Sequence, residues 1–329
     1  MKSFSIGFPD CNCGKSEVLQ CDLGEAGVIA MVEISRRNRE RIVILQFIVP
    51  SLMIIGIFIL FPITKAITMA FQEWILTSSS PDHPFVGMNN FREVFSITHF
   101  PKMITNTLVY TAGSVGGKMI VGLGVALLLN RKFIGRGIVR GLMLIPWAMP
   151  MVVVTNVFRI ALDPSYGLFN ALLSSLPFVD GPIQFFSNGP LALGTLVGIG
   201  IWKNFPFVSL MLLAALQSVP QDYYDAASID GAGTLAQFRK ITWPLIKPIW
   251  NTLMILQILW TVKEFELIYL ITQGGPNNGT NIIGIDIYLN AFRFYKIGAA
   301  NAEGILLLLF CLVFAIVYFR SMHKKGDFV

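Results

Sequence analysis

The stretch IVILQFIVPSLMIIGIFILFPIT, residues 42–64, decides the class of fold, because it contains no charged side chain. At about 1.5 Å of rise per residue, a helix of this length crosses a hydrocarbon core of roughly 30 Å. The whole chain of 329 residues is similar: 54% of them are hydrophobic, 13% are charged, and the mean hydropathy is +0.65. Soluble domains carry about 25% charged residues. The composition therefore predicts an all-α, polytopic membrane protein and argues against a soluble two-domain enzyme.

Further apolar segments follow the first, and the sequence predicts six transmembrane helices in all. The expected spans are about 42–64, 107–129, 141–158, 193–217, 249–271 and 298–319. They divide the chain into a tail at 1–41, a transmembrane domain at 42–319 with a polar loop at 218–248, and a short tail at 320–329.

Lysine and arginine alternate between rich and poor segments, and this alternation predicts the orientation of the spans. The rich segments hold Arg36, Arg37, Arg39, Arg41, Arg131, Lys132, Arg136, Arg140, Arg239, Lys240, Lys247, Arg320, Lys324 and Lys325. The poor segments hold Lys65, Arg92, Lys102, Arg159, Arg293 and Lys296. Since cytoplasmic loops carry the basic excess, both termini and the 218–248 loop are expected in the cytoplasm. The net charge of +6 follows from this bias and does not indicate nucleic-acid binding.

Some polar motifs resemble sites of chemistry but lack the residues that such sites need. PDCNCGKS (residues 9–16) ends like a phosphate-binding loop, yet Pro9 stands where the first glycine is required and no apolar strand precedes it. Other candidates for metal or acid–base chemistry are Cys11, Cys13, Cys21, Cys311, His83, His99 and His323. Cys11 and Cys13 form a single C-x-C without a second Cys or His pair, which is a weak metal signal, so we expect reduced, non-ligating thiols. No histidine has a partner at metal-ligand or general-base spacing. The sequence predicts no catalytic residue, no metal site and no cofactor bound by this chain.

The polar loop contains YYDAASIDGAGTLAQFRKITWPLIKP, residues 223–248. Its GAGTLA fits a dinucleotide pattern, but no strand precedes it, as that fold requires. Pro220 suits the first position of a short helix, and Gly231 or Gly233 could end that helix in a left-handed conformation. Thr234 with Gln237 predicts a capping box for a second helix. Helix, glycine hinge and helix together indicate a surface on which another protein docks.

The same stretch resembles the EAA loop of bacterial ABC importer permeases, whose pattern is roughly E-A-A-x-x-D-G-A, then a hydrophobic stretch, then I-x-x-P-x-x-x-P. The residues that fit are Asp230, Gly231, Ala232, Phe238, Ile241, Pro244 and Pro248. Asp225 stands where the family usually has Glu, which shortens that side chain by one methylene.

Other stretches resemble the sugar branch of that family: FVGMNNF (85–91), NTLVYT (106–111), IPWAMP (145–150), YGLFN (166–170) and FELIYLITQGGPNNGT (265–280). The resemblance covers about residues 42–320. It is to permeases of the maltose and glycerol-3-phosphate type, and within that type to the first of two paired subunits.

The resemblance implies a type I ABC importer permease that moves a saccharide across the bacterial inner membrane. The implied partners are a second permease subunit, a dimer of ABC ATPase subunits and an extracytoplasmic solute-binding protein. ATP and Mg would bind to the partner ATPase, so this chain would be a transport subunit and not an enzyme. The residues implied for the ATPase contact are Tyr224, Asp225, Ala226, Ala227, Asp230, Gly231, Ala232 and Phe238.

Polar and aromatic side chains recur at helical spacing on the fifth expected span. Such a face is costly in lipid, so it is predicted to point inward, as a solute path or as a packing seam between helices, and both stay open. The candidate path consists of Lys203, Asn204, Gln257, Trp260, Thr261 and Glu264. Lys203 and Lys263 also leave open an anionic saccharide.

Two other functions compete with the importer. A secondary transporter could couple ions through Lys263, Glu264 and Glu266, but it would need inverted repeats, and the halves of the chain show no convincing similarity. A membrane enzyme acting on a lipid-linked sugar would need clustered carboxylates or histidines, and the acidic residues here are scattered. Dependence of transport on ATP hydrolysis by a partner separates these alternatives.

Overall fold

A computed structural model describes residues 46–77, 82–177 and 181–324, without the side chains of 321–324. It separates into two compact units, Met1–Ala66 and Ile67–Val329. The described part of the first unit is helical throughout, within a helix that runs Gln46–Ala70 and contains the π-helical turn η1 (Gly56–Leu60) and α2 (Phe61–Ala70). The predictions for the N-terminal tail, including Cys11, Cys13 and Cys21, lie outside the described residues.

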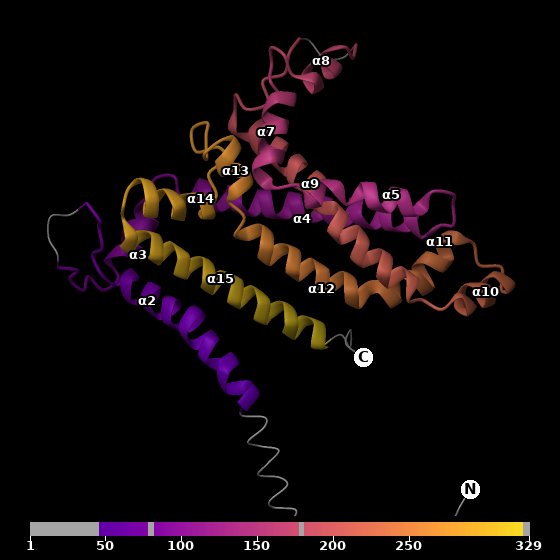
Figure 1. Ribbon diagram of the computed structural model, residues 1–329, viewed down its shortest axis with the longest axis horizontal. Helices are drawn as coiled ribbons and strands as arrows, with labels where there is room; N and C mark the ends of the chain where they lie inside the picture. The colour runs from indigo at the N-terminus through magenta and orange to yellow at the C-terminus, as the bar shows by residue number, and fades with distance from the viewer. Residues whose placement is uncertain (1–45, 78–81, 178–180, 325–329) are drawn as a thin grey trace, which may run out of the picture. The chain divides into compact units, whose positions relative to one another are not determined.

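Helices dominate the second unit (Figure 1). The long ones are α4 (Phe100–Asn130), α9 (Gly189–Gln217) and α15 (Ile297–Lys324), together with a continuous helix Thr234–Val262 made of α11 (Thr234–Gln237), the π-helical turn η2 (Phe238–Thr242) and α12 (Trp243–Val262). The short ones are α3 (Asn89–Ser96), α5 (Arg136–Met143), α6 (Ile145–Ala148), α7 (Met151–Ala161), α8 (Leu168–Ser174), α10 (Gln221–Ile229), α13 (Glu266–Ile271), α14 (Ile283–Tyr288) and η3 (Leu289–Arg293). Within the described ranges the only β-structure is two isolated bridges, so the predicted all-α class is confirmed.

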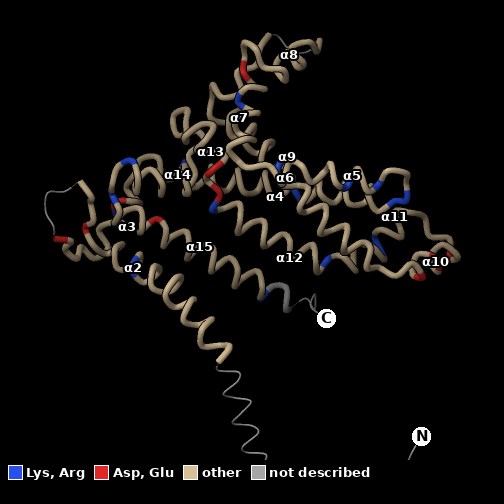
Figure 2. Tube along the Cα trace, in the orientation of Figure 1, with Lys and Arg blue, Asp and Glu red and all other residues tan. Residues whose placement is uncertain are grey.

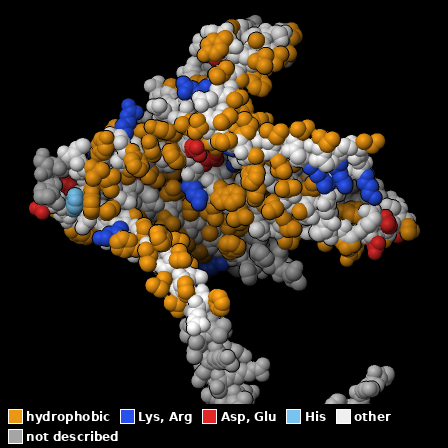
Figure 3. Space-filling model, in the orientation of Figure 1, with side chains coloured by type: hydrophobic (Ala, Val, Ile, Leu, Met, Phe, Trp, Pro, Cys, Tyr) orange, Lys and Arg blue, Asp and Glu red, His pale blue; other side chains and the backbone are white. Residues whose placement is uncertain are grey.

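The described residues contain 5 helices long and apolar enough to cross a membrane, or up to 6 if one bent pair forms a single span. The expected spans 107–129, 193–217 and 298–319 each lie within one of the long helices. Many of their large apolar side chains are exposed, among them Leu308, Leu312 and Val317 of α15. Figure 3 shows hydrophobic side chains over most of the visible face. Lipid is the solvent that suits such a surface.

The third expected span, 141–158, is not a straight helix. The segments Arg136–Ala148 and Met151–Ala161 are bent by 92° relative to each other. The break lies at Met149, whose φ of -68° and ψ of 137° are extended. Pro150 explains this, because its ring disfavours the helical conformation of the residue before it. The sequence analysis counted this segment by apolar length and overlooked the break.

The fifth expected span, 249–271, is also corrected. The continuous helix begins at Thr234, inside the expected loop, and ends at Val262, while α13 is a separate short helix. Pro244 lies inside this continuous helix, in the first turn of α12 directly after the π-helical turn η2. Pro248 is accommodated inside α12.

The core of the second unit forms where α4 packs along α9 and both contact α12. Buried side chains from the three helices meet there, including Met119, Leu212 and Ile246. Close approach of α4 and α9 depends on Gly122, where an added Cβ would lie 2.7 Å from Val208 Cγ1 and 3.3 Å from the backbone nitrogen of Ser209. Small residues at helix contacts are the usual means of packing inside a membrane.

The two ends of this three-helix core differ in charge. The end of the helices at Leu129, Leu216 and Ile246, which we call the basic end, carries α5, α10 and α11 (Figure 1). Figure 2 shows lysine and arginine gathered there. The opposite end, which we call the far end, carries residues 162–177, 181–188 and 272–282, which contain no lysine or arginine.

A close backbone contact joins two segments at the far end. At Gly189, the first residue of α9, an added Cβ would lie 2.7 Å from the Cα of Gly279, in the loop after α13. Asn106 of α4 holds the same loop by donating to the carbonyls of Asn278 (2.9 Å) and Asn281 (3.0 Å). The loop is therefore fixed against both α9 and α4.

We expect Gly189→Ala to destabilise the protein by about 1–3 kcal/mol, because the methyl group meets backbone that cannot rotate away. Gly194→Ala is the matched control: it lies in the same helix, and a Cβ there has nothing within 4 Å. Thermal unfolding in detergent measures both variants. Equal unfolding temperatures for the two would contradict the close contact.

Candidate functional site

The α10–α11 segment at the basic end contains a complete helix C-cap. Gly231 has a φ of +77°, in the left-handed region that favours glycine. Its amide donates to the carbonyl of Ser228 (3.1 Å), and the amide of Ala232 donates to that of Ala227 (2.9 Å). This pair of bonds is the Schellman motif. Of the two glycines considered from the sequence, Gly231 ends α10.

Side chains tie α10 to the long helix that follows. Gln237 Nε2 donates to Ser228 Oγ (2.9 Å) and to the carbonyl of Ala232 (3.1 Å). The hydroxyl groups of Tyr224 and Thr242 lie 2.9 Å apart and share a hydrogen bond. The predicted capping box of Thr234 and Gln237 is therefore wrong. Gly233 is the N-cap of α11, and Gln237 bonds instead to Ser228 and Ala232 across the turn. A bond across eighteen residues, such as Tyr224 to Thr242, leaves no sequence periodicity that could reveal it.

The surface of the segment carries apolar side chains that face away from the rest of the unit. Ile229 is 87% exposed and Leu235 is 75% exposed. Of the residues implied for the ATPase contact, Asp225, Ala226, Asp230 and Gly231 are exposed; Tyr224, Ala227, Ala232 and Phe238 are half-buried. Exposed apolar side chains on a capped, braced helix are typical of a protein contact surface.

A small cavity, which we call the inner cavity, lies between α4, α9 and α12 and has a volume of about 160 Å³. It is lined by Lys118, Trp147, Asn204, Phe207, Gln257, Trp260, Thr261 and Glu264. All the predicted path residues except Lys203 thus come together. Phe207 stacks on Trp147 with ring centroids 5.8 Å apart and approaches Trp260 at 5.5 Å. The cavity combines aromatic faces with amide, hydroxyl and charged groups.

Lys118 is a lining residue that the sequence analysis did not assign to the path. It is 2% exposed, and its Nζ donates to Thr261 Oγ1 at 2.9 Å. In the sequence Lys118 is recognisable only as a single charged residue within an apolar span. A buried ammonium group requires polar partners. A lysine inside an apolar span could therefore have been recognised as a residue that contacts polar groups between the helices.

Lys203 has a different environment from the one expected. Its Nζ donates to the carbonyls of Met149 (2.8 Å), Trp147 (3.3 Å) and Pro146 (3.4 Å). These carbonyls lie at the 92° bend, where the helix that ends at Ala148 leaves its last carbonyls without amide partners. An ammonium group has three hydrogens, and the three carbonyls use them. The contacts favour a role for Lys203 in holding the bend over a role in the solute path.

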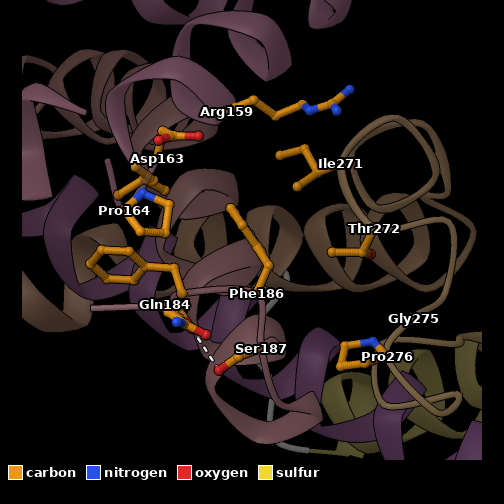
Figure 4. A pocket seen from close by; sticks show the side chains of 12 residues that line it. Arg159, Asp163, Pro164, Gln184, Phe186, Ser187, Ile271, Thr272, Gly275 and Pro276 are labelled. Atoms are coloured by element: carbon orange, nitrogen blue, oxygen red, sulfur yellow. Dashed lines mark hydrogen bonds between the residues drawn. The ribbon is translucent and has the colours of Figure 1, made fainter. Parts of the chain in front are cut away.

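A larger cavity, the far-end cavity, has a volume of about 600 Å³. It lies between the end of α7, the residues before α9 and the loop after α13. Figure 4 shows Arg159 extending on one side of it, with Asp163 and Pro164 facing Thr272 and Pro276 across the space. Within the described part of the chain, no group of three or more His, Cys, Asp or Glu side chains could hold a metal ion.

Helices long enough to span a membrane, a capped surface helix and a polar cavity between helices are the features of a multi-pass membrane protein. Residues 118–322 match the family described as binding-protein-dependent transport system inner membrane component. The chain belongs to this family, and its resemblance to permeases of ABC sugar importers is confirmed.

Relatives match over most of their length. The chain is 36% identical over 283 residues to the trehalose/maltose transport system permease protein MalF of Thermococcus litoralis, covering 85% of this chain and 93% of the relative. It is 30% identical over 286 residues to the sulfoquinovosyl glycerol transport system permease protein SmoG of Agrobacterium fabrum, covering 87% and 92%. A bacterial ABC transporter that imports the acidic polysaccharide alginate has a chain of the same fold, with a TM-score of 0.76, 23% identity and coverage of 86% and 96%.

Proposed function

We propose that the chain is the transmembrane subunit of an ATP-driven importer that moves a saccharide across the bacterial inner membrane. The observation that carries this proposal is the α10–α11 segment: a Schellman-capped helix with exposed apolar residues, bonded to the helix that lines the inner cavity. A dimer of ABC ATPase subunits would bind this segment, and ATP with Mg would bind to that partner. The chain itself would hold no cofactor.

The orientation follows from the charge of the two ends. The basic end carries Arg131, Lys132, Arg136, Arg140, Arg239, Lys240 and Lys247. The positive-inside rule places this end in the cytoplasm, where ATP is available. If the bent pair α5–α7 counts as one span, the chain has six spans, and both termini would then be cytoplasmic. The far end then faces the extracytoplasmic solute-binding protein.

The inner cavity supplies one wall of the solute path. At about 160 Å³ it is smaller than the 300–1,000 Å³ of ordinary small-ligand sites. Trp147 and Trp260, which line it, are each about half exposed. A second permease subunit would therefore complete the site. A sugar ring offers an apolar face to tryptophan and hydroxyl groups to Gln257 and Asn204, which suits this lining.

The proposed cycle moves these parts as rigid bodies. Closure of the ATPase dimer would displace α10, and the bonds from Gln237 and Tyr224 would pass the displacement to the helix Thr234–Val262. That helix carries Gln257, Trp260 and Thr261. Its movement would open the cavity to one side of the membrane and close it to the other.

The charged residues around the inner cavity do not require an anionic saccharide. Lys203 contacts carbonyl oxygens, and Lys263 is not among the residues that line the inner cavity. The cavity contains one lysine, Lys118, and one carboxylate, Glu264. This balance of charge does not select for a negative solute.

Reconstitution in liposomes with the partner permease, ATPase and binding protein tests the proposal. Uptake of labelled maltotriose, or of labelled trigalacturonate, is expected only with ATP. Uptake without ATP that follows an ion gradient would overturn it and favour the alternative in which Lys263, Glu264 and Glu266 couple ions.

In the same assay we expect Trp260→Ala to raise the KM for uptake about tenfold, the equivalent of about 1.4 kcal/mol of lost contact with the sugar. The ATPase activity without solute should be unchanged. Trp202→Ala is the matched control, because Trp202 is a partly exposed tryptophan of α9 that does not line the cavity. Equal KM values for the two variants would remove Trp260 from the path.

A further inference from the structure

We propose that the far-end cavity is a second saccharide-binding site, an antechamber in which one sugar unit rests before it reaches the inner cavity. This inference rests on the proposed function, because it takes the far end to be extracytoplasmic. It goes beyond that function by assigning a separate site, on this chain alone, to a cavity that shares no residue with the inner one.

The size and lining of the cavity suit a sugar. Its volume of about 600 Å³ falls within the range of small-ligand sites. Phe185 and Phe186 contribute aromatic surface, while Gln184, Ser187 and Thr272 contribute amide and hydroxyl groups. A sugar ring has both an apolar face and a rim of hydroxyl groups, so it uses the two kinds of surface together.

Two charged residues of the lining, Arg159 and Asp163, carry groups that can form hydrogen bonds with a ligand. Arg159 is exposed, and Figure 4 shows its guanidinium group at the edge of the cavity near Ile271. Asp163 accepts the amides of Ser165 (2.8 Å) and Tyr166 (3.3 Å) through Oδ1. The Oδ2 atom of Asp163 and the five N–H groups of Arg159 could bind sugar hydroxyls.

The walls of the cavity are fixed before any ligand arrives. Asn170 of α8 donates to the carbonyls of Ile183 (2.7 Å) and Leu162 (3.3 Å) and accepts the amide of Ile183 (2.8 Å). On the opposite wall the hydroxyl groups of Thr272 and Thr280 lie 2.7 Å apart. A site built in advance loses little conformational entropy on binding, so weak polar contacts suffice.

The two cavities have lining residues that are close together in the chain. Glu264 lines the inner cavity and Ile271 lines the far-end cavity, and α13 (Glu266–Ile271) connects them. At about 1.5 Å per residue this helix measures about 9 Å. A saccharide of a few units could therefore leave one site while entering the other.

Cysteine protection tests this inference on the complete complex. Gln184→Cys places a thiol on the exposed lining of the cavity, in a chain whose native cysteines are replaced by serine. Ser175→Cys is the matched control, because Ser175 is exposed on the same side of the unit but does not line the cavity. A membrane-impermeant maleimide labels both from outside right-side-out proteoliposomes, and maltotriose or trigalacturonate is added as the probe.

We expect one of the two trisaccharides to slow labelling of Gln184→Cys about tenfold when it is present at about ten times its Kd, because only the empty site reacts. Labelling of Ser175→Cys should not change. Adding Phe186→Ala or, as a variant with less effect on folding, Arg159→Ala should weaken the protection at least threefold in apparent Kd.

Labelling of Gln184→Cys that neither trisaccharide slows would overturn the antechamber. Slowing by the empty binding protein, with no effect of either sugar, would also overturn it and make the cavity a protein contact. Two other results would contradict the proposed function itself. If Ser175→Cys is not labelled from outside, the proposed orientation is wrong. If uptake in the same vesicles does not require ATP, the chain is not part of an ATP-driven importer.

Discussion

Replacing Gly231 by serine is expected to abolish ATP-driven uptake while the complex still assembles in the membrane. A residue with a Cβ pays about 1–2 kcal/mol to adopt the left-handed conformation that Gly231 has at φ +77°. That cost lowers the ratio of the closed to the open Schellman turn by roughly 5–30-fold. The turn sets the direction in which α10 leaves the long helix, so ATP hydrolysis would no longer move the solute path. Uptake and ATPase activity are measured on the same vesicles.

Gly233→Ser provides the matched control for this experiment. Gly233 has a φ of -72°, and a Cβ there has nothing within 4 Å. It is also the N-cap of α11, a position that favours serine. We expect nearly full uptake from Gly233→Ser and intermediate uptake from Gly231→Asn, since asparagine tolerates the left-handed conformation. Full uptake with Gly231→Ser would contradict the role of the turn.

Replacing Lys203 by methionine is expected to cause the second large effect, a loss of stability on the order of 3 kcal/mol. Methionine keeps an unbranched side chain, one heavy atom shorter than that of lysine, but leaves the carbonyls of Met149, Trp147 and Pro146 without their donor. A buried polar group without a partner costs about 1–3 kcal/mol. The unfolding midpoint in denaturant measures this loss.

Two readouts separate a positioning role of Lys203 from direct contact with the sugar. If Lys203 holds the bend, the variant unfolds earlier and the folded fraction transports with nearly the same KM. A raised KM with unchanged stability would show instead that Lys203 binds the solute. Lys263→Met is the matched control, because Lys263 is exposed at the end of α12, and we expect it to alter neither quantity.

The parts of the fold that depend on local pattern could be predicted from the sequence. Apolar length located the helices α4, α9 and α15, and the left-handed preference of glycine limited the hinge to Gly231 or Gly233, of which Gly231 is left-handed. The spacing of Gln257, Trp260 and Thr261 placed them on one helix face, which lines the inner cavity, whereas Glu264 lines the cavity from beyond the end of α12.

Features that depend on contacts between distant residues could not be predicted in this way. Lys203 and Lys118 both appear in the sequence as isolated charges in apolar helices. Their partners, a bent segment fifty-four residues earlier for Lys203 and Thr261 for Lys118, are defined only by the packing of α4, α9 and α12. The bend itself had a local signal in Pro150, which a count of apolar length does not use.

The bond between Tyr224 and Thr242 has a mechanical consequence. Thr242 and Thr261 belong to one continuous helix, and nineteen residues at about 1.5 Å each separate them by about 28 Å. The helix then acts as a lever: a tilt of about 5° around its end at Thr242 shifts Thr261 by about 2.5 Å. A displacement of that size exceeds the tolerance of a hydrogen bond. A small movement of α10 would thus suffice to break the hydrogen bond between Lys118 and Thr261 and to change the contacts of the inner cavity with a bound sugar.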